Sequence, residues 1–171
     1  MTVKYASSEI PFLRAESDAP AVNTPDCFFT DLILSRPASL NRFEARLRQT
    51  RIPGERLACA LVRIAPLPED PDHDRVKPGF EQTFNQVLDH ERGIWEALDD
   101  SAFLLAFWDW ETPQRALDLL ESLKLKMSDA FDTSILMGVS FFPFHGFSKE
   151  ETLENALKAA DHAAFFGPDS L

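Results

Sequence analysis

The order of short apolar segments constrains the fold of this chain more than any other feature of its sequence. Four runs have the length and apolar character of buried strands: residues 57–64, 94–98, 102–108 and 135–142. Apolar residues at helical spacing occupy the stretches around them: residues 32–47, 80–88, 113–127 and 148–164. The inner βαββαβ order, with a hairpin between the second and third runs, predicts an α/β fold. We expect an α+β sandwich with a ferredoxin-like core, in which a mainly antiparallel sheet carries helices on one face.

Individual residues predict where several of these elements begin and end. Ser39 is expected to cap the helix that contains Leu40, Phe43 and Leu47. Gly93 is expected to stop the helix over residues 80–88, and Pro113 to open the next helix at its first turn. Ser148 and Glu151 have the spacing of a capping box ahead of the last helix.

The length of the chain suits one domain. Its 171 residues leave little room for a second domain, and 44% hydrophobic residues are enough to bury a core. Residues 1–26 carry Pro11, Pro20 and Pro25 among small polar and acidic residues, which is typical of an irregular leader or linker. We therefore expect a leader over residues 1–26 and one domain over residues 27–171.

Charge and composition argue against several classes of partner. The formal net charge of −11 would repel nucleic acid and anionic membranes, so we expect neither. No apolar run approaches the ~20 residues that a membrane span needs, and the N-terminus lacks the apolar stretch of a signal peptide. Cys27 and Cys59 fit no metal or redox spacing and are expected to be free thiols of a cytoplasmic protein.

One acidic stretch has part of the pattern of a calcium-binding loop. Asp70, Asp72, Asp74 and Glu81 stand at the first, third, fifth and twelfth places of such a loop, but Arg75 stands where a glycine is needed. A solvated acidic loop is therefore the favoured interpretation, with a cation site as the alternative. The four His residues are scattered, and no Ser-His-Asp or Cys-His relay can be assembled. We expect no bound metal, no cofactor and no catalytic residues.

Aromatic residues gather around the predicted hairpin and after the last predicted strand: Trp95, Trp108, Trp110, Phe141, Phe142, Phe144 and Phe147. Packing in the core is the favoured interpretation. The alternative is an aromatic surface for a protein partner, because Trp and Phe are enriched at interfaces.

Four stretches match the pattern of one known family in the same order. They are Asp31-Leu32 with Leu40-Asn41-Arg42-Phe43, Asp99-Asp100-Ser101-Ala102-Phe103 on the hairpin, Ser134-Ile135-Leu136-Met137-Gly138-Val139-Ser140, and Ala160-Asp161-His162-Ala163-Ala164-Phe165. Together they resemble the GGDEF domain of bacterial diguanylate cyclases, in which the hairpin carries Gly-Gly-Asp-Glu-Phe. The resemblance covers the chain from about Asp31 to Gly167.

The resemblance implies a nucleotide-cyclase fold and an activity that joins two GTP molecules into cyclic di-GMP with two divalent metals. The family's metal-binding carboxylates would fall on Arg63 and Ala65 after the first strand, and on Ser101 and Ala102 of the hairpin. None of these residues has a carboxylate. Even a single positive charge ~4 Å from Arg63 would be repelled by on the order of a few kcal/mol at an effective dielectric near ~20. The resemblance thus implies the fold and argues against the activity.

Other features of the family are altered as well. Asp99 and Asp100 replace the two glycines that let the backbone approach a nucleotide, which adds bulk and negative charge. The family's stretch that receives guanine and ribose has no counterpart between residues 66 and 80. Its inhibitory Arg-x-x-Asp would fall on His90 and Gly93, so we expect no cyclic di-GMP at that position.

These residues together predict a non-catalytic GGDEF-like module that regulates or binds proteins in bacterial signal transduction. The expected partner is another protein or other domains of a longer chain, a homodimer is a further option, and nucleotide binding is not expected. The alternatives are a catalytically dead domain that still senses a nucleotide, and an enzyme of unrelated chemistry. We also predict that Arg63 pairs with Asp99 or Asp100 and so fills the vacant metal position; the alternative is that Arg63 points to solvent.

Overall fold

The structure, a computed structural model, describes residues 28–52, 56–64, 76–88, 92–108, 110–131 and 134–165. The predicted leader over residues 1–26, Cys27 and the acidic residues 70–75 lie outside this part of the chain. The domain boundary and the cation-site alternative therefore stay predictions.

The described strands form one antiparallel sheet in the order β2-β3-β1-β4. The strands are β1 Leu57–Ile64, β2 Gly93–Ala97, β3 Ala102–Trp108 and β4 Ile135–Phe142. In the middle of the sheet, Leu61 of β1 lies opposite Leu104 of β3 and Gly138 of β4. The predicted βαββαβ order and the antiparallel sheet are confirmed.

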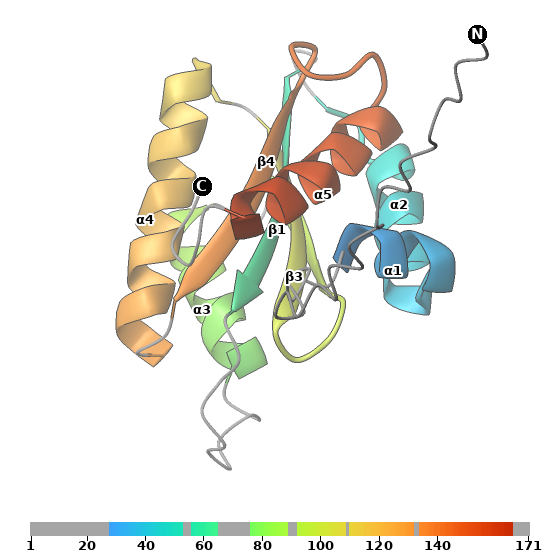
Figure 1. The fold of residues 1–171 in the computed structure, drawn as a ribbon. Coiled ribbons are helices and arrows are strands. Elements are labelled where there is room, and N and C mark those ends of the chain that lie inside the picture. Colours follow the sequence, from blue (N-terminus) through green and yellow to red (C-terminus); the bar gives the residue numbers. More distant parts are fainter. Residues whose placement is uncertain are drawn as a thin grey trace, which may run out of the picture.

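Helices cover both faces of this sheet (Figure 1). They are α1 Phe28–Ser35, α2 Ala38–Gln49, α3 Val76–Val87, α4 Pro113–Phe131 and α5 Lys149–Phe165. α3 and α4, the two helices inside the βαββαβ unit, pack on one face, as predicted. α1, α2 and α5 pack on the other, so the fold has three layers. Within the described residues, no helix combines the length and the apolar character that crossing a bilayer requires.

The core between the sheet and α3 is strongly aromatic. Phe80 of α3 stacks on Phe103 of β3, with ring centroids 4.2 Å apart and planes within 6°. Trp95 of β2 meets Phe80 edge-on at 5.4 Å. Such aromatic pairs add about 0.5–1.5 kcal/mol beyond the burial of their surface. Phe103, the last residue of the hairpin motif, is therefore a core residue.

The opposite core is mainly aliphatic and holds Cys59 of β1, which is fully buried. Burial disfavours the thiolate and raises the pKa of the Cys59 thiol far above its ordinary value. Cys59 is unpaired, as expected from the sequence. A thiol in this state behaves as a small apolar side chain.

Two predicted helix signals are wrong. Ser39 lies inside α2, because the chain enters this helix at Pro37 and no side chain caps it. The Ser39 hydroxyl instead donates to the Leu98 carbonyl at 3.4 Å and so links α2 to the hairpin. Gly93 does not stop α3, which ends at Val87; it is the first residue of β2.

The entry to α5 follows the predicted capping pattern with a shift of one residue. The Glu151 N–H donates to Ser148 Oγ at 3.1 Å, which is the expected cap. The Glu151 carboxylate accepts from the N–H of Phe147 at 2.8 Å, where a capping box would use the cap residue itself. The start of α5 is thereby fixed at Lys149.

Gly138 brings α5 unusually close to the sheet. A Cβ atom at this position would lie 2.0 Å from the backbone N of Ala160 and 2.3 Å from the carbonyl O of Ala156. Only glycine on the strand, facing alanines on the helix, permits this approach. Two of the four family-like stretches, those around Gly138 and Ala160, therefore contact one another directly.

Candidate functional site

The end of β1 and the hairpin turn lie side by side, as the resemblance implies for a shared site. The N–H of Ile64 donates to the Ser101 carbonyl at 2.8 Å. Arg63 lies opposite Ala102 in the β1–β3 register. Both side chains follow the strand alternation onto the face that packs against α2 and α5. The sheet register therefore places Arg63 beside Ser101 and Ala102 of the hairpin.

The turn itself is closed by its own side chains. Asp99 Oδ1 accepts hydrogen bonds from the N–H of Ser101 at 2.7 Å and from Ser101 Oγ at 3.0 Å, which is an Asx-type turn. The N–H of Leu98 donates to the Ala102 carbonyl at 2.8 Å. Among the described non-glycine residues, Arg36 alone has a positive φ. The turn thus uses ordinary backbone conformations and has no need of glycine.

The charges at this junction are divided between a half-buried cation and exposed acids. Arg63 is half-buried, whereas Asp99 and Asp100 are exposed. Ala102 and Phe103 are buried and have no polar side-chain atoms. The Asp99 carboxylate already closes the turn, and the predicted ion pair between Arg63 and Asp99 or Asp100 stays a prediction. Ala65 lies outside the described residues.

The donor set of this junction does not suit the two divalent ions that the resemblance implies. Divalent metals of this kind require several oxygen ligands, chiefly carboxylates. The described side chains here include the guanidinium of Arg63, one hydroxyl and two exposed carboxylates, one of which is engaged in the turn. Across the described residues, no three His, Cys, Asp or Glu side chains come together in a group that could hold a metal ion.

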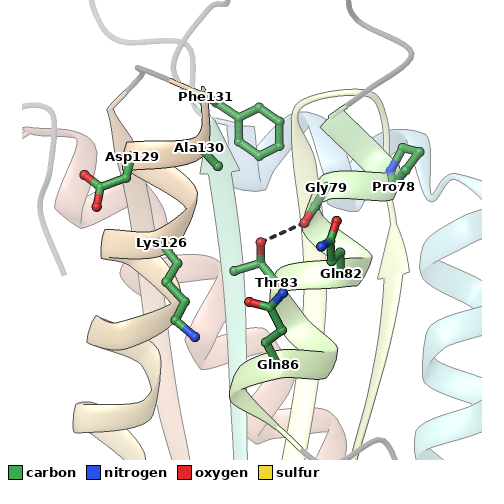
Figure 2. Close-up of a pocket in the computed structure, with 9 residues that line it drawn as sticks. All are labelled: Pro78, Gly79, Gln82, Thr83, Gln86, Lys126, Asp129, Ala130 and Phe131. Atoms are coloured by element: carbon green, nitrogen blue, oxygen red, sulfur yellow. Dashed lines mark hydrogen bonds between the residues drawn. The ribbon is translucent and has the colours of Figure 1, made fainter.

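A pocket of about 710 Å³ lies elsewhere, between α3 and α4 (Figure 2). Phe131 lies beside Gly79 at one end, and Lys126 and Gln86 lie further along it. The Thr83 hydroxyl is occupied by a 2.8 Å hydrogen bond to the Gly79 carbonyl of its own helix. The lining contains none of the predicted site residues, so this pocket and the β1–hairpin junction are separate features.

The remaining predicted residues are dispersed. Gly93 is buried in β2, while His90 lies outside the described residues, so the inhibitory position stays a prediction. His162 is exposed on α5.

The aromatic residues divide between the two interpretations. Trp108, Trp110 and Phe141 are buried, which agrees with core packing. Phe144 and Phe147, in the loop between β4 and α5, are 64% and 95% exposed. This loop therefore presents apolar rings to solvent, as the alternative of an aromatic surface requires.

Sequence analysis missed a groove beside β4, lined by residues of that strand, by Leu117 of α4 and by α5. The groove exists because β4 lies at the edge of the sheet, and no local sequence pattern predicts which strand takes the edge position. The one available signal was the absence of charge in residues 135–142, which was interpreted only as burial.

The chain matches no protein-family model and no curated protein. It is similar in fold to solved GGDEF structures. An EAL/GGDEF domain protein from M. capsulatus superposes with a TM-score of 0.62 at 14% identity, over 76% of this chain and 92% of that chain. A sensory box/GGDEF family protein from Caulobacter crescentus has a TM-score of 0.55 at 22% identity, over 81% and 92%.

A third structure of this fold is the diguanylate cyclase SiaD in complex with its activator SiaC, from Pseudomonas aeruginosa. It superposes with a TM-score of 0.57 at 18% identity, over 83% of this chain and 65% of that chain. The chain therefore has the fold of GGDEF domains, and the resemblance seen in the sequence is confirmed at the level of the fold.

Proposed function

We propose that this chain is a non-catalytic GGDEF-like module that acts in bacterial signalling by binding a protein or another domain, and that it makes no cyclic di-GMP. The observation that carries the proposal is the chemistry of the β1–hairpin junction. A cation, Arg63, and two hairpin residues without carboxylates, Ser101 and Ala102, stand where the family's chemistry needs metal-binding carboxylates.

The shape of the hairpin supports the same conclusion. In the family, two glycines let the backbone approach a nucleotide. Here Asp99 and Asp100 occupy those places, and Asp99 binds Ser101 within the turn. Two exposed carboxylates beside the turn would also repel the phosphates of GTP.

Protein binding is supported by the exposed surface. Phe144 and Phe147 are large apolar side chains in solvent, only three positions apart on one loop, and such residues are enriched at interfaces. SiaD, which shares this fold, was solved in complex with an activator. By analogy, we infer that the fold of this chain serves as a scaffold for a protein partner.

Calorimetry with GTP and with cyclic di-GMP, each with Mg²⁺, tests the proposal against the nucleotide-sensor alternative. We expect no saturable heat with either nucleotide at concentrations up to about 1 mM, where even a weak site of about −4 kcal/mol would be half filled. Saturable binding of GTP that is lost in Asp99→Lys would favour the sensor. Binding of cyclic di-GMP that is lost in His90→Ala would show that the inhibitory position is functional.

A further inference from the structure

The two edge strands of the sheet differ in how their outer backbone is protected. β2 is short and contains Glu96, whose carboxylate binds Arg42 at 2.7 Å and Arg46 at 3.3 Å, both on α2. Arg46 also donates to the Trp95 carbonyl at 3.0 Å. Charged side chains and occupied backbone groups are the means by which proteins keep an edge strand from pairing further.

β4 lacks these protections. Its eight residues, Ile135–Phe142, contain no charged side chain and no proline. Among the described residues, β4 pairs only with β1. An edge of this length and composition is a template for another strand unless something covers it.

The hydrogen bonds of Phe141, near the end of β4, show which backbone groups of this strand point away from β1. The Phe141 N–H donates to His145 Nδ1 at 3.3 Å, and the Phe141 carbonyl accepts from the His145 N–H at 2.6 Å. Both backbone groups of Phe141 therefore point away from β1. Because this direction alternates along an antiparallel strand, the N–H and C=O groups of Val139 and Met137 also point outward, and no described strand lies opposite them.

A groove of about 890 Å³ lies along this edge. On one side it is apolar, with Leu117 of α4 beside Met137 and Val139. On the other side α5 contributes polar groups, including Lys158 and His162. An added strand in this groove would alternate its side chains between an apolar side and a polar side.

The charges of the groove differ from those of the chain as a whole. Its lining includes Lys158, His145 and His162 but no carboxylate, although the chain has a net charge of −11. Lys158 pairs with Glu154 of the same helix at 2.7 Å, and both side chains are about half exposed. An exposed pair of this kind contributes little to stability.

We propose that the β4 edge binds an extended segment of a partner protein, which pairs with Met137 and Val139 as a fifth strand and alternates apolar side chains with carboxylates. Backbone hydrogen bonds to the strand would supply affinity, and the two sides of the groove would supply specificity. The inference rests on the proposed function and names the surface and the partner chemistry for it.

A second copy of the chain suits this groove less well. Antiparallel pairing of two β4 strands about a two-fold axis places both α5 helices on the same face of the joined sheet. Lys158 and His162 of the two copies would then approach each other, and β4 itself has no carboxylate to offer them. An acidic segment from a different protein meets the same groups with opposite charge.

Amide hydrogen exchange followed by NMR tests the free edge directly. In the protein alone we expect Met137 and Val139 to exchange much faster than Gly138 and Ser140, whose amides face β1. Slow exchange of Met137 and Val139 in the monomer would mean that the chain itself covers the edge, and would overturn the proposal. A concentration-dependent dimer, seen by light scattering, that protects these amides would also overturn it in favour of a second copy.

The partner chemistry is tested with a library of random linear ten-residue peptides displayed on phage and selected on the intact protein. We expect peptides with alternating apolar and acidic residues, whose synthetic forms protect the Met137 and Val139 amides on binding. Lys158→Glu and His162→Glu should each weaken binding, and together by about tenfold. Lys126→Glu, the same charge reversal on an exposed lysine outside the groove, should leave it unchanged.

The proposal would be overturned if the selected peptides bound without protecting the β4 amides or bound both groove variants as well as the original protein. It would also be overturned if the peptides carried no acidic residues, or if the selection yielded no peptide. These outcomes are distinct from failure of the proposed function, which would show as nucleotide binding or turnover. The nucleotide assays report on the proposed function, and the peptide and exchange experiments report on the β4 edge, so either proposal can fail while the other stands.

Discussion

At the scale of single residues, the hairpin turn depends on Asp99 rather than on Asp100. Asp99 accepts two hydrogen bonds from Ser101, whereas Asp100 is exposed on the turn. We predict that Asp99→Ala lowers the free energy of unfolding by about 1 kcal/mol, the usual net value of such bonds. Asp100→Ala, the matched control, should change it by less than about 0.5 kcal/mol.

Urea unfolding followed by tryptophan fluorescence measures both variants, because Trp95 and Trp108 lie on the hairpin strands. A shift of the midpoint without a change in slope would confirm a change in stability alone. Equal loss in the two variants, or a larger loss in Asp100→Ala, would contradict the role given to Asp99.

At this scale, the sequence predicted which segments lie together better than it predicted the place of individual side chains. The resemblance placed Arg63 near the hairpin, and the pairing of Arg63 with Ala102 confirms that the two segments adjoin. Ser39 was misplaced because a cap is defined by where the helix begins, and the cap is Pro37, two positions earlier than expected. Side-chain direction, on which the Arg63 ion pair depends, does not follow from residue type.

At the scale of elements, the contact between β4 and α5 holds the second core together. Gly138→Ala would place a methyl group against the backbone of α5, and neither the strand nor the helix can move without disturbing its neighbours. We predict a loss of stability of about 1–3 kcal/mol, as for overpacked cores. Differential scanning calorimetry should show a lower Tm.

Gly79→Ala provides the control on α3. Its added methyl group would meet the end of the Phe131 ring, 2.4 Å away. Phe131 is half-buried at the pocket in Figure 2, so we expect its side chain to swing aside through χ1 at little cost. Alanine also favours the helix by about 0.5–1 kcal/mol, so the net change should be small. If Gly79→Ala were as damaging as Gly138→Ala, the close contact of β4 with α5 would not be the cause.

The elements with long apolar patterns were predicted well. The bounds of β1 and β4 agree with the predicted runs, because each is buried on both faces and reads as a continuous apolar segment. α1 and α2 were not separated in the sequence, because the break is made by backbone at Arg36, which adopts a φ of 38°. The conformation of Arg36 itself has no sequence signal, but Pro37 directly after it is a helix-boundary signal that the prediction did not use.

At the scale of the whole molecule, the four family-like stretches lie next to one another in the fold, although they are far apart in the sequence. The stretch around Gly138 packs on the stretch around Ala160. Next to the stretch with Arg42, Ser39 donates to Leu98, which directly precedes the hairpin stretch. Sequence patterns that reflect such paired contacts predict a fold even at 14–22% identity to solved structures. The β4 groove could not be predicted this way, because it arises from strand order.

The central claim is that this fold is present without its cyclase chemistry, and an assay of the product tests it most directly. Purified protein is incubated with GTP and either Mg²⁺ or Mn²⁺, and cyclic di-GMP is measured by chromatography, with an active diguanylate cyclase as the positive control. The absence of carboxylates from Arg63, Ser101 and Ala102 predicts no product above the buffer blank. Cyclic di-GMP that forms in proportion to the protein, and whose formation follows it through purification, would contradict the account.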